Sequence, residues 1–244
     1  IKTSKKGTDW IDVGVFSSPY TYEFAKSWEQ PIFTRSLAPE YVPYYLLGLR
    51  YKRKINTNLS LTTFLLNGWQ HLEIQRKIPS LGTQLEYTKK KNYINWTSYQ
   101  GNEKNVAQPN FGYRFFTEMS WIYTTNKFKL FACGYTGMQL ISGQAKFWGQ
   151  MHFAGEFQLI KKLLVNARIE QFLDPNNIQI RQGSNHGFNC SGLSLGLHAK
   201  VTDFLSLRLE SRLLLDNSKK GGFIKEGQQT NLLPLGFIGV QLKF

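Results

Sequence analysis

Apolar and polar residues alternate with a period of two along most of this chain. The alternation is clear over 145–159. Phe147 and Phe153 share one side of that segment, whereas Gln150 and His152 lie on the other. Successive side chains of a strand point to opposite faces, so this period predicts β-strands rather than helices. The same pattern is clear over 162–173, 189–201 and 204–216.

Applied to the whole chain, this reading predicts twelve strands, most of them long enough to cross a membrane at a tilt. No stretch approaches the eighteen consecutive apolar residues that a transmembrane helix needs. The predicted strands are 9–17, 43–54, 57–69, 80–89, 92–101, 111–124, 126–140, 145–159, 162–173, 189–201, 204–216 and 232–244.

The connections between these segments alternate between short and long. Tight turns are predicted near 54–57, 89–92, 124–127, 159–162 and 201–204. Longer connections are predicted at 17–42, 70–80, 101–110, 141–144, 174–188 and 216–231. Short turns at one end and long loops at the other are typical of an outer-membrane barrel. The predicted fold is therefore all-β, a transmembrane antiparallel up-and-down β-barrel.

The number of strands indicates which face lies inside. A cylinder of twelve or more strands is too wide for side chains to fill, so its interior is aqueous. The charged face is then expected to line the lumen, and the leucine-rich face to contact outer-membrane lipid. The predicted lumen-lining residues are Arg50, Arg114, Glu118, Lys146, Arg168, Glu170, Arg208, Glu210 and Arg212.

Two further features fit a membrane barrel. Aromatic residues near strand ends suggest interfacial girdles, although the general β-propensity of aromatics would explain many of them; they are Tyr44, Tyr45, Tyr51, Tyr87, Tyr99, Tyr113, Trp121 and Tyr123. The alternation of 232–244 ends on Phe244. A terminal aromatic of this parity resembles the signal that the barrel-assembly machinery reads.

The net charge of +14 would suggest nucleic acid as a partner. The dense basic clusters, 52–54 and 89–91, are short and fall at strand ends, and no nucleic-acid motif is present, so that partner is not predicted. Cys133 and Cys190 could form a disulfide in an oxidising compartment, but two separate small strand residues are the preferred reading. Residues 1–7 lack the apolar core of a signal peptide, so we expect one to have been removed.

Catalysis is not predicted either. Ser194 and His198 share a strand face but lie about 13 Å apart, too far for a nucleophile and its base. No phosphate loop, dinucleotide fingerprint or zinc spacing is present in the sequence. We therefore expect no enzyme activity, no metal and no cofactor.

The connection 17–42 contains three prolines and six aromatic residues. A loop this apolar is unsuited to free solvation, which favours a loop folded into the lumen that narrows the pore. The alternative is a loop packed on the rim that closes the barrel mouth. The predicted constriction residues are Glu23, Lys26, Glu29 and Arg35. Arg35 stands out among them, and its alternative role is an ion pair with Glu23 or Glu29.

Basic residues outnumber acidic ones on the predicted lumen face. Rings of Arg and Lys in a pore favour anions, so a weak anion preference is one reading. Local neutralisation of these charges, with the excess on turns and loops, is the other.

One part of the sequence carries specific motifs in addition to the alternation of apolar and polar residues. Residues 9–103 contain a skeleton of Gly14-Val15-Phe16, Pro19, Glu23, Phe33-Thr34-Arg35-Ser36-Leu37 and Gly48-Leu49-Arg50, followed by 65–70, 82–87 and 101–103. With this skeleton the segment resembles the OmpL-like β-barrel porin family (porin-2 type) of Bacteroidota and, more distantly, the phosphate-selective porins O and P.

The resemblance implies a porin that lets small hydrophilic solutes diffuse passively across the bacterial outer membrane. It also implies that strands precede residue 1, giving roughly sixteen strands in one barrel domain; closure by twelve strands alone is the alternative. The expected partners are outer-membrane lipid, small solutes or anions, and either further copies in a homotrimer or other envelope proteins. The competing function is a structural or accessory barrel with a plugged lumen, in a larger outer-membrane complex.

Overall fold

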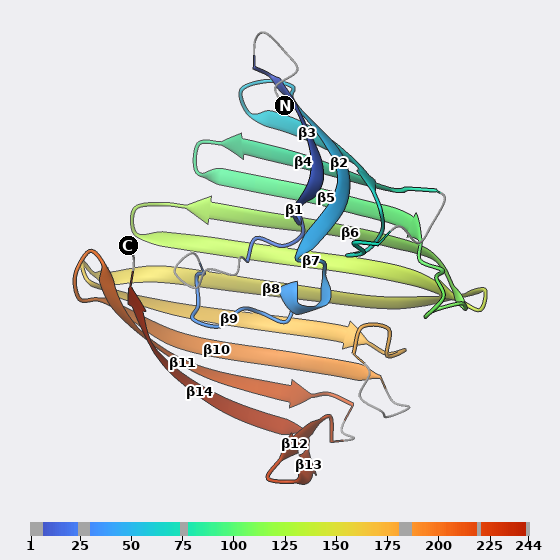
Figure 1. The fold of residues 1–244 in the computed structure, drawn as a ribbon. Coiled ribbons are helices and arrows are strands. Elements are labelled where there is room, and N and C mark those ends of the chain that lie inside the picture. Colours follow the sequence, from blue (N-terminus) through green and yellow to red (C-terminus); the bar gives the residue numbers. More distant parts are fainter. Residues whose placement is uncertain (1–6, 24–29, 74–77, 181–186, 219–220, 243–244) are drawn as a thin grey trace. The chain divides into compact units, whose positions relative to one another are not determined.

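A computed structural model of the chain describes residues 7–23, 30–73, 78–180, 187–218 and 221–242, and these residues form antiparallel β-structure (Figure 1). Twelve strands form one sheet, in which hydrogen-bonded neighbours follow the order of the chain. They are β1 (Asp9–Ser17), β2 (Tyr45–Lys54), β3 (Leu59–Leu66), β4 (Ser80–Lys89), β5 (Asn92–Asn102), β6 (Phe111–Thr124), β7 (Phe128–Ile141), β8 (Gln144–Ile160), β9 (Leu163–Asp174), β10 (Phe188–Lys200), β11 (Leu205–Asp216) and β14 (Leu232–Leu242).

These strands confirm the twelve predicted from the alternation, with ends that differ by a few residues. The structure adds one 3₁₀ turn, η2 (Pro39–Tyr41), and a small hairpin of β12 (Phe223–Lys225) and β13 (Gln228–Thr230). Strands of three residues are too short to show a period, so the hairpin was missed. Glu226 and Gly227 close it with positive φ angles of 51° and 79°.

The strands divide between two compact units. Unit 1 comprises Ile1–Tyr20, Tyr41–Trp121 and Tyr135–Phe147, and unit 2 comprises Thr21–Glu40, Ile122–Gly134 and Trp148–Phe244. Among the described residues, no helix has the length and apolar character needed to cross a bilayer.

In unit 1, one face of the strands exposes apolar side chains and the other buries polar ones. Val13 and Met119 are 75% and 56% exposed, whereas Thr97 and Glu118 are almost completely buried. The register keeps the two faces separate, because Val13 pairs with Leu49 in β1 and β2. Water-soluble sheets have the opposite arrangement.

Unit 2 shows the same inversion more strongly. Leucines at alternate positions of β10 and β11 are 39–56% exposed. On the other face, Arg168, Glu170 and Glu210 are at most 5% exposed. We call the two sides of the strands the apolar face and the polar face. Exposed leucine and buried charge suit strands whose apolar face contacts lipid.

Cys133 and Cys190 both lie in unit 2 and are buried. The two thiols are not joined in a disulfide, in agreement with the preferred reading of the sequence. Both belong to the face that also carries the buried polar residues.

An arginine on the apolar face should destabilise the protein in a bilayer. Leu195, in the middle of β10, is 56% exposed and pairs with Ala167 and Ser211. We expect Leu195→Arg to lower the free energy of unfolding in phospholipid vesicles by about 2–4 kcal/mol, because the guanidinium enters hydrocarbon. Denaturant titration followed by tryptophan fluorescence measures this, with Leu195→Ala as the control. Equal stability of the two variants would contradict a lipid-facing Leu195.

Candidate functional site

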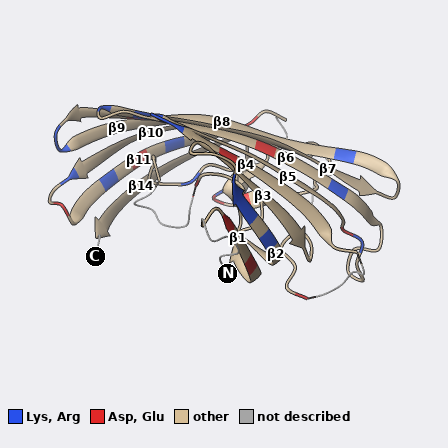
Figure 2. Cartoon of the chain, turned by 90° about the horizontal axis from the view of Figure 1, so that it is seen from above, with Lys and Arg blue, Asp and Glu red and all other residues tan. Residues whose placement is uncertain are grey.

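The candidate site is the polar face of unit 2, on which residues 30–38 of the connection 17–42 lie. Three strand arginines donate hydrogen bonds to backbone carbonyl oxygens of this segment. Arg168 Nη1 reaches the oxygen of Thr34 at 2.8 Å, Arg208 Nη2 that of Gln30 at 2.9 Å, and Arg212 Nη1 that of Arg35 at 3.2 Å. Basic positions along these strands are blue in Figure 2.

Two strand glutamates accept hydrogen bonds from backbone N–H groups of the same segment. The Thr34 N–H donates to Glu210 Oε2 at 2.6 Å, and the Thr34 hydroxyl donates to Glu210 Oε1 at 2.8 Å. The Leu37 N–H donates to Glu170 Oε2 at 2.7 Å. Buried backbone groups need such partners, and charged partners give the stronger hydrogen bonds. Side chains of the sheet therefore supply the hydrogen bonds that this loop backbone would otherwise lack.

The same side chains also pair with one another. Glu170 Oε1 lies 2.5 Å from Arg212 Nη2 and 3.3 Å from Arg168 Nε. Arg168 Nη2 lies 3.5 Å from Glu210 Oε1. We call Arg168, Glu170, Glu210 and Arg212 the Arg–Glu network. Two positive and two negative charges balance within it, which lowers the cost of burying them.

Glu23 is buried against the same segment. Its carboxylate accepts hydrogen bonds from the Ser36 N–H, at 3.0 Å, and from the Ser36 hydroxyl. Arg168 Nη1 lies 3.8 Å away. Burial raises the pKa of Glu23, while Arg168 and the Ser36 donors oppose that rise. Glu23 is thus a structural member of the folded loop.

A second anchor is apolar and aromatic. Tyr22 stacks on Phe131 with ring centroids 5.2 Å apart, and its hydroxyl is hydrogen-bonded to His152 Nε2 at 2.5 Å. Ile32 is completely buried in the same cluster, together with Cys133 and Ala154. Burial of these groups stabilises the loop against the strands.

A third contact depends on a glycine. The Phe33 ring approaches Gly239 of β14 so closely that an added Cβ would lie 2.2 Å from Phe33 Cζ. A larger residue at position 239 could not coexist with this ring position. The sequence pattern showed Gly239 on the face opposite Ile238 and Val240, but nothing in it pointed to Phe33.

Arg35 pairs with Glu40, a partner that the sequence did not suggest. Its Nη2 lies 2.6 Å from Glu40 Oε1, with the two side chains 27% and 41% exposed. Glu23 is held by Ser36 and Arg168 instead. Arg35 therefore places a partly exposed guanidinium on the segment. Lys26 and Glu29, the other predicted constriction residues, lie outside the described residues, as does Phe244.

In unit 1 the predicted lumen residues also lie on the polar face. Arg50 Nε donates to Asp12 Oδ2 at 2.7 Å, and Arg114 Nε donates to Gln139 Oε1 at 2.8 Å. Glu118 is 1% exposed, and Lys146 is half-buried beside Trp148 on the same side of β8.

An aromatic cluster fills part of the polar face of unit 1, and the sequence did not reveal it. Trp69 packs at about 5 Å between ring centroids against Tyr20, Tyr99 and Phe116. The guanidinium of Arg114 lies 5.1 Å from the Trp69 ring centroid. Placing Tyr99 in an interfacial girdle was therefore wrong, since it is 1% exposed within this cluster.

The comparisons with known proteins address the family. The family model described as "Putative beta-barrel porin-2, OmpL-like" matches residues 1–244. The chain belongs to this family. As a member of this porin-2 family, it is a β-barrel protein of the bacterial outer membrane. The match names neither Bacteroidota nor the phosphate-selective porins, so those parts of the resemblance stay predictions. No curated protein matches the chain.

Two solved structures show the same fold. A refined porin structure aligns with a TM-score of 0.56 at 9% identity, covering 82% of this chain and 62% of that porin. OmpT, an outer-membrane protein of Vibrio cholerae folded in vitro, aligns with a TM-score of 0.57 at 10% identity, covering 95% of this chain and 75% of that protein. The chain thus spans less than two thirds of the length of the first of these. The description of the family, a β-barrel porin, is that of a channel protein rather than an enzyme.

The Phe33–Gly239 contact gives a direct test of how the loop is fixed. We expect Gly239→Ala to displace Phe33 and lower the free energy of unfolding by about 1–3 kcal/mol, because the added methyl overpacks the contact. Gly236→Ala, on the same strand, is the matched control, since an added Cβ there meets no described atom within 4 Å.

Hydrogen exchange over 30–38 is the readout, with unfolding titrations alongside. Exchange should rise in Gly239→Ala, and a second change, Phe33→Ala, should remove the clash. Identical exchange in Gly239→Ala and Gly236→Ala would show that Phe33 does not lie against β14.

Replacing the Glu210 carboxylate by a neutral amide should weaken its hydrogen bonds with Thr34. Glu210→Gln is expected to cost about 1.5–3 kcal/mol of unfolding free energy, because charge-assisted hydrogen bonds are lost in a buried place. Glu226→Gln, in the exposed β12–β13 turn, should leave stability unchanged. Denaturant midpoints in detergent micelles compare the two, and equal midpoints would contradict a stabilising Arg–Glu network.

Proposed function

We propose that the chain forms the wall of a water-filled pore through which small hydrophilic solutes diffuse passively. In this proposal both units belong to one barrel domain, their polar faces line the lumen, and their apolar faces contact lipid. Arg50, Arg114, Lys146 and Glu118 then lie along the solute path, together with Arg208 and the Arg–Glu network.

One observation carries the proposal. Residues 30–38 are fixed to the polar face by five charged side chains, while the opposite face exposes leucines. A connection held on that side of the strands lies inside a membrane barrel and narrows it. The proposed constriction is the connection 17–42, with Arg35 as its charged, partly exposed residue.

The proposed weak preference for anions rests on particular basic residues rather than on the whole charge balance, because the polar face also carries acidic residues such as Glu118. The Arg–Glu network is neutral, and Asp12 pairs with Arg50. Arg208 and Lys146 add positive charge to the polar face, and Arg35 is only partly exposed beside Glu40. Excess basic charge near a narrow passage favours anions over cations.

The tight packing of the loop also supports the second candidate, an accessory barrel with a plugged lumen. Ile32 and Ala38 are 0% exposed, so this part of the connection is as well packed as a protein core. A plug and a constriction differ in whether water and ions pass. Other envelope proteins would be the partners of a plugged barrel, and a homotrimer would suit the pore.

Conductance across a planar bilayer, with a salt gradient, tests the pore and its selectivity. We expect stable open steps and a reversal potential on the anion side. Arg35→Glu should move the reversal potential towards cations, because it reverses a charge at the constriction. Lys90→Glu makes the same charge change at the β4–β5 turn and serves as the control.

Each outcome has one meaning. If Arg35→Glu and Lys90→Glu shift the reversal potential equally, Arg35 is not at the constriction. A folded wild-type protein that never conducts would support the plugged accessory barrel instead.

A further inference from the structure

Unit 2 also contains a cavity, which is separate from the Arg–Glu network described above. Its volume is about 820 Å³, within the range of small-molecule sites. It lies at the short-turn end of the strands, between residues of the β8–β9 and β10–β11 turns, with Gln30 and Pro31 of the connection on one side. Its strand residues Glu156, His198 and Arg208 belong to the polar face, away from lipid.

The cavity is strongly basic. Five basic side chains line it against two acidic ones, Glu156 and Asp203. The basic residues are Lys129, Lys161, Lys162, Lys200 and Arg208. These lysines come from β7, from the β8–β9 turn and from the end of β10, so the fold gathers charges that lie far apart in sequence.

Some of these groups are already engaged in holding the structure. Arg208 donates to the carbonyl oxygens of Gln30 and Pro31, at 2.9 and 3.2 Å. The Lys162 ammonium donates to the carbonyl oxygen of Val201 at 3.1 Å. Lys129, Lys161 and Lys200 are solvent-exposed and line the same cavity.

The base of the cavity offers hydrogen-bonding groups beside this charge. His198 Nδ1 lies 3.8 Å from Glu156 Oε2, and Gln241 and Ser206 complete the lining there. A solute with charged and neutral polar groups could contact both parts at once. A monovalent anion has only one charge to pair with these ammonium groups.

We propose that this cavity binds a small organic solute that carries two or more negative charges. Several ammonium groups around one space suit a polyvalent anion, because each additional carboxylate or phosphate group finds a charged donor. The site is separate from the constriction at Arg35. The proposal extends the proposed function by naming a solute class, and it rests on the polar face being open to solutes.

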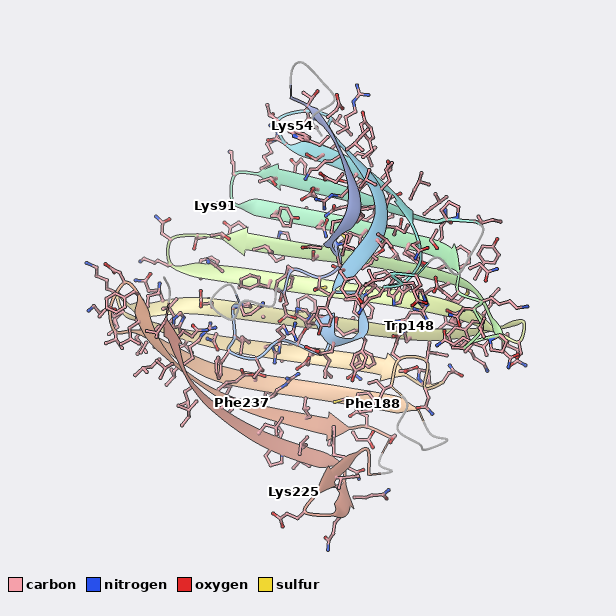
Figure 3. All side chains as sticks on the ribbon, viewed as in Figure 1. Lys54, Lys91, Trp148, Phe188, Lys225 and Phe237 are labelled. Atoms are coloured by element: carbon pink, nitrogen blue, oxygen red, sulfur yellow. The ribbon has the colours of Figure 1, made fainter. Side chains whose placement is uncertain are left out.

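Equilibrium binding of citrate by calorimetry, on the folded full chain in detergent micelles, tests the site. We expect saturable binding that weakens roughly tenfold in Lys129→Gln/Lys161→Gln/Lys200→Gln, since three partly exposed ion pairs are lost. The matched control is Lys54→Gln/Lys90→Gln/Lys91→Gln. It removes the same charge from turn ends of unit 1, where Figure 3 labels Lys54 and Lys91, and should bind citrate as the wild type does.

Absence of citrate binding, or equal weakening in both triple variants, would overturn the site, because the attraction would then come from net charge alone. The calorimetry does not need an open pore. A protein that binds citrate at these lysines but never conducts would refute the pore and leave the binding site standing. A protein that conducts without binding citrate would do the reverse.

Discussion

The hydrogen bonds between the Arg–Glu network and the backbone of residues 30–38 are the constraint on which the rest of unit 2 depends. Four charges are removed from water on the polar face, a loss that their pairing alone does not offset. The loop backbone supplies the remaining partners, carbonyl oxygens for Arg168 and Arg212 and N–H groups for Glu170 and Glu210. Removing the charged side chains would leave buried backbone groups of the loop without hydrogen bonds, and removing the loop would do the same to the side chains. The charged strand residues and the folded loop are therefore one structural element.

This mutual dependence explains why the loop also carries apolar residues. Hydrogen bonds fix the direction of the backbone, but their net contribution to stability is small. Tyr22 and Ile32 add buried apolar area against Phe131, and Phe33 fits over Gly239. In unit 1, Trp69 plays a comparable part by filling the polar face between Tyr20, Tyr99 and Phe116. The polar faces thus contain locally packed aromatic regions as well as charge.

The two faces of the strands suit different surroundings. Exposed leucines at alternate positions of β10 and β11 suit contact with hydrocarbon, whereas Arg168, Glu170 and Arg212 are paired with one another on the polar face. The basic cavity near Lys161 and Lys200 shows that not all of this charge is neutralised in place. In the proposed pore, exposed charge would act on solutes and paired charge would hold the wall together.

The sequence by itself determined the twelve strands of the sheet, which side chains share each face, and the class of fold. A period of two is a local property, so Arg168 and Glu170 could be placed opposite Ile169 without any long-range information. The alternation of short turns and long connections was predicted in the same way, but it fails between β7 and β8, which are joined by Ser142 and Gly143 alone. Three-residue strands such as β12 fell below what a period can reveal.

Only the tertiary structure decided the partners. Thr34 and Glu210 are 176 residues apart, and no local pattern links them. Arg35, for which an ion pair with Glu23 or Glu29 was the alternative role, lies beside Glu40. Ser36 and Arg168 hold Glu23. The basic cavity likewise combines lysines from separate turns. Which charges meet depends on the path of the loop across the polar face, and that path is set by packing and hydrogen bonds between residues that are distant in sequence.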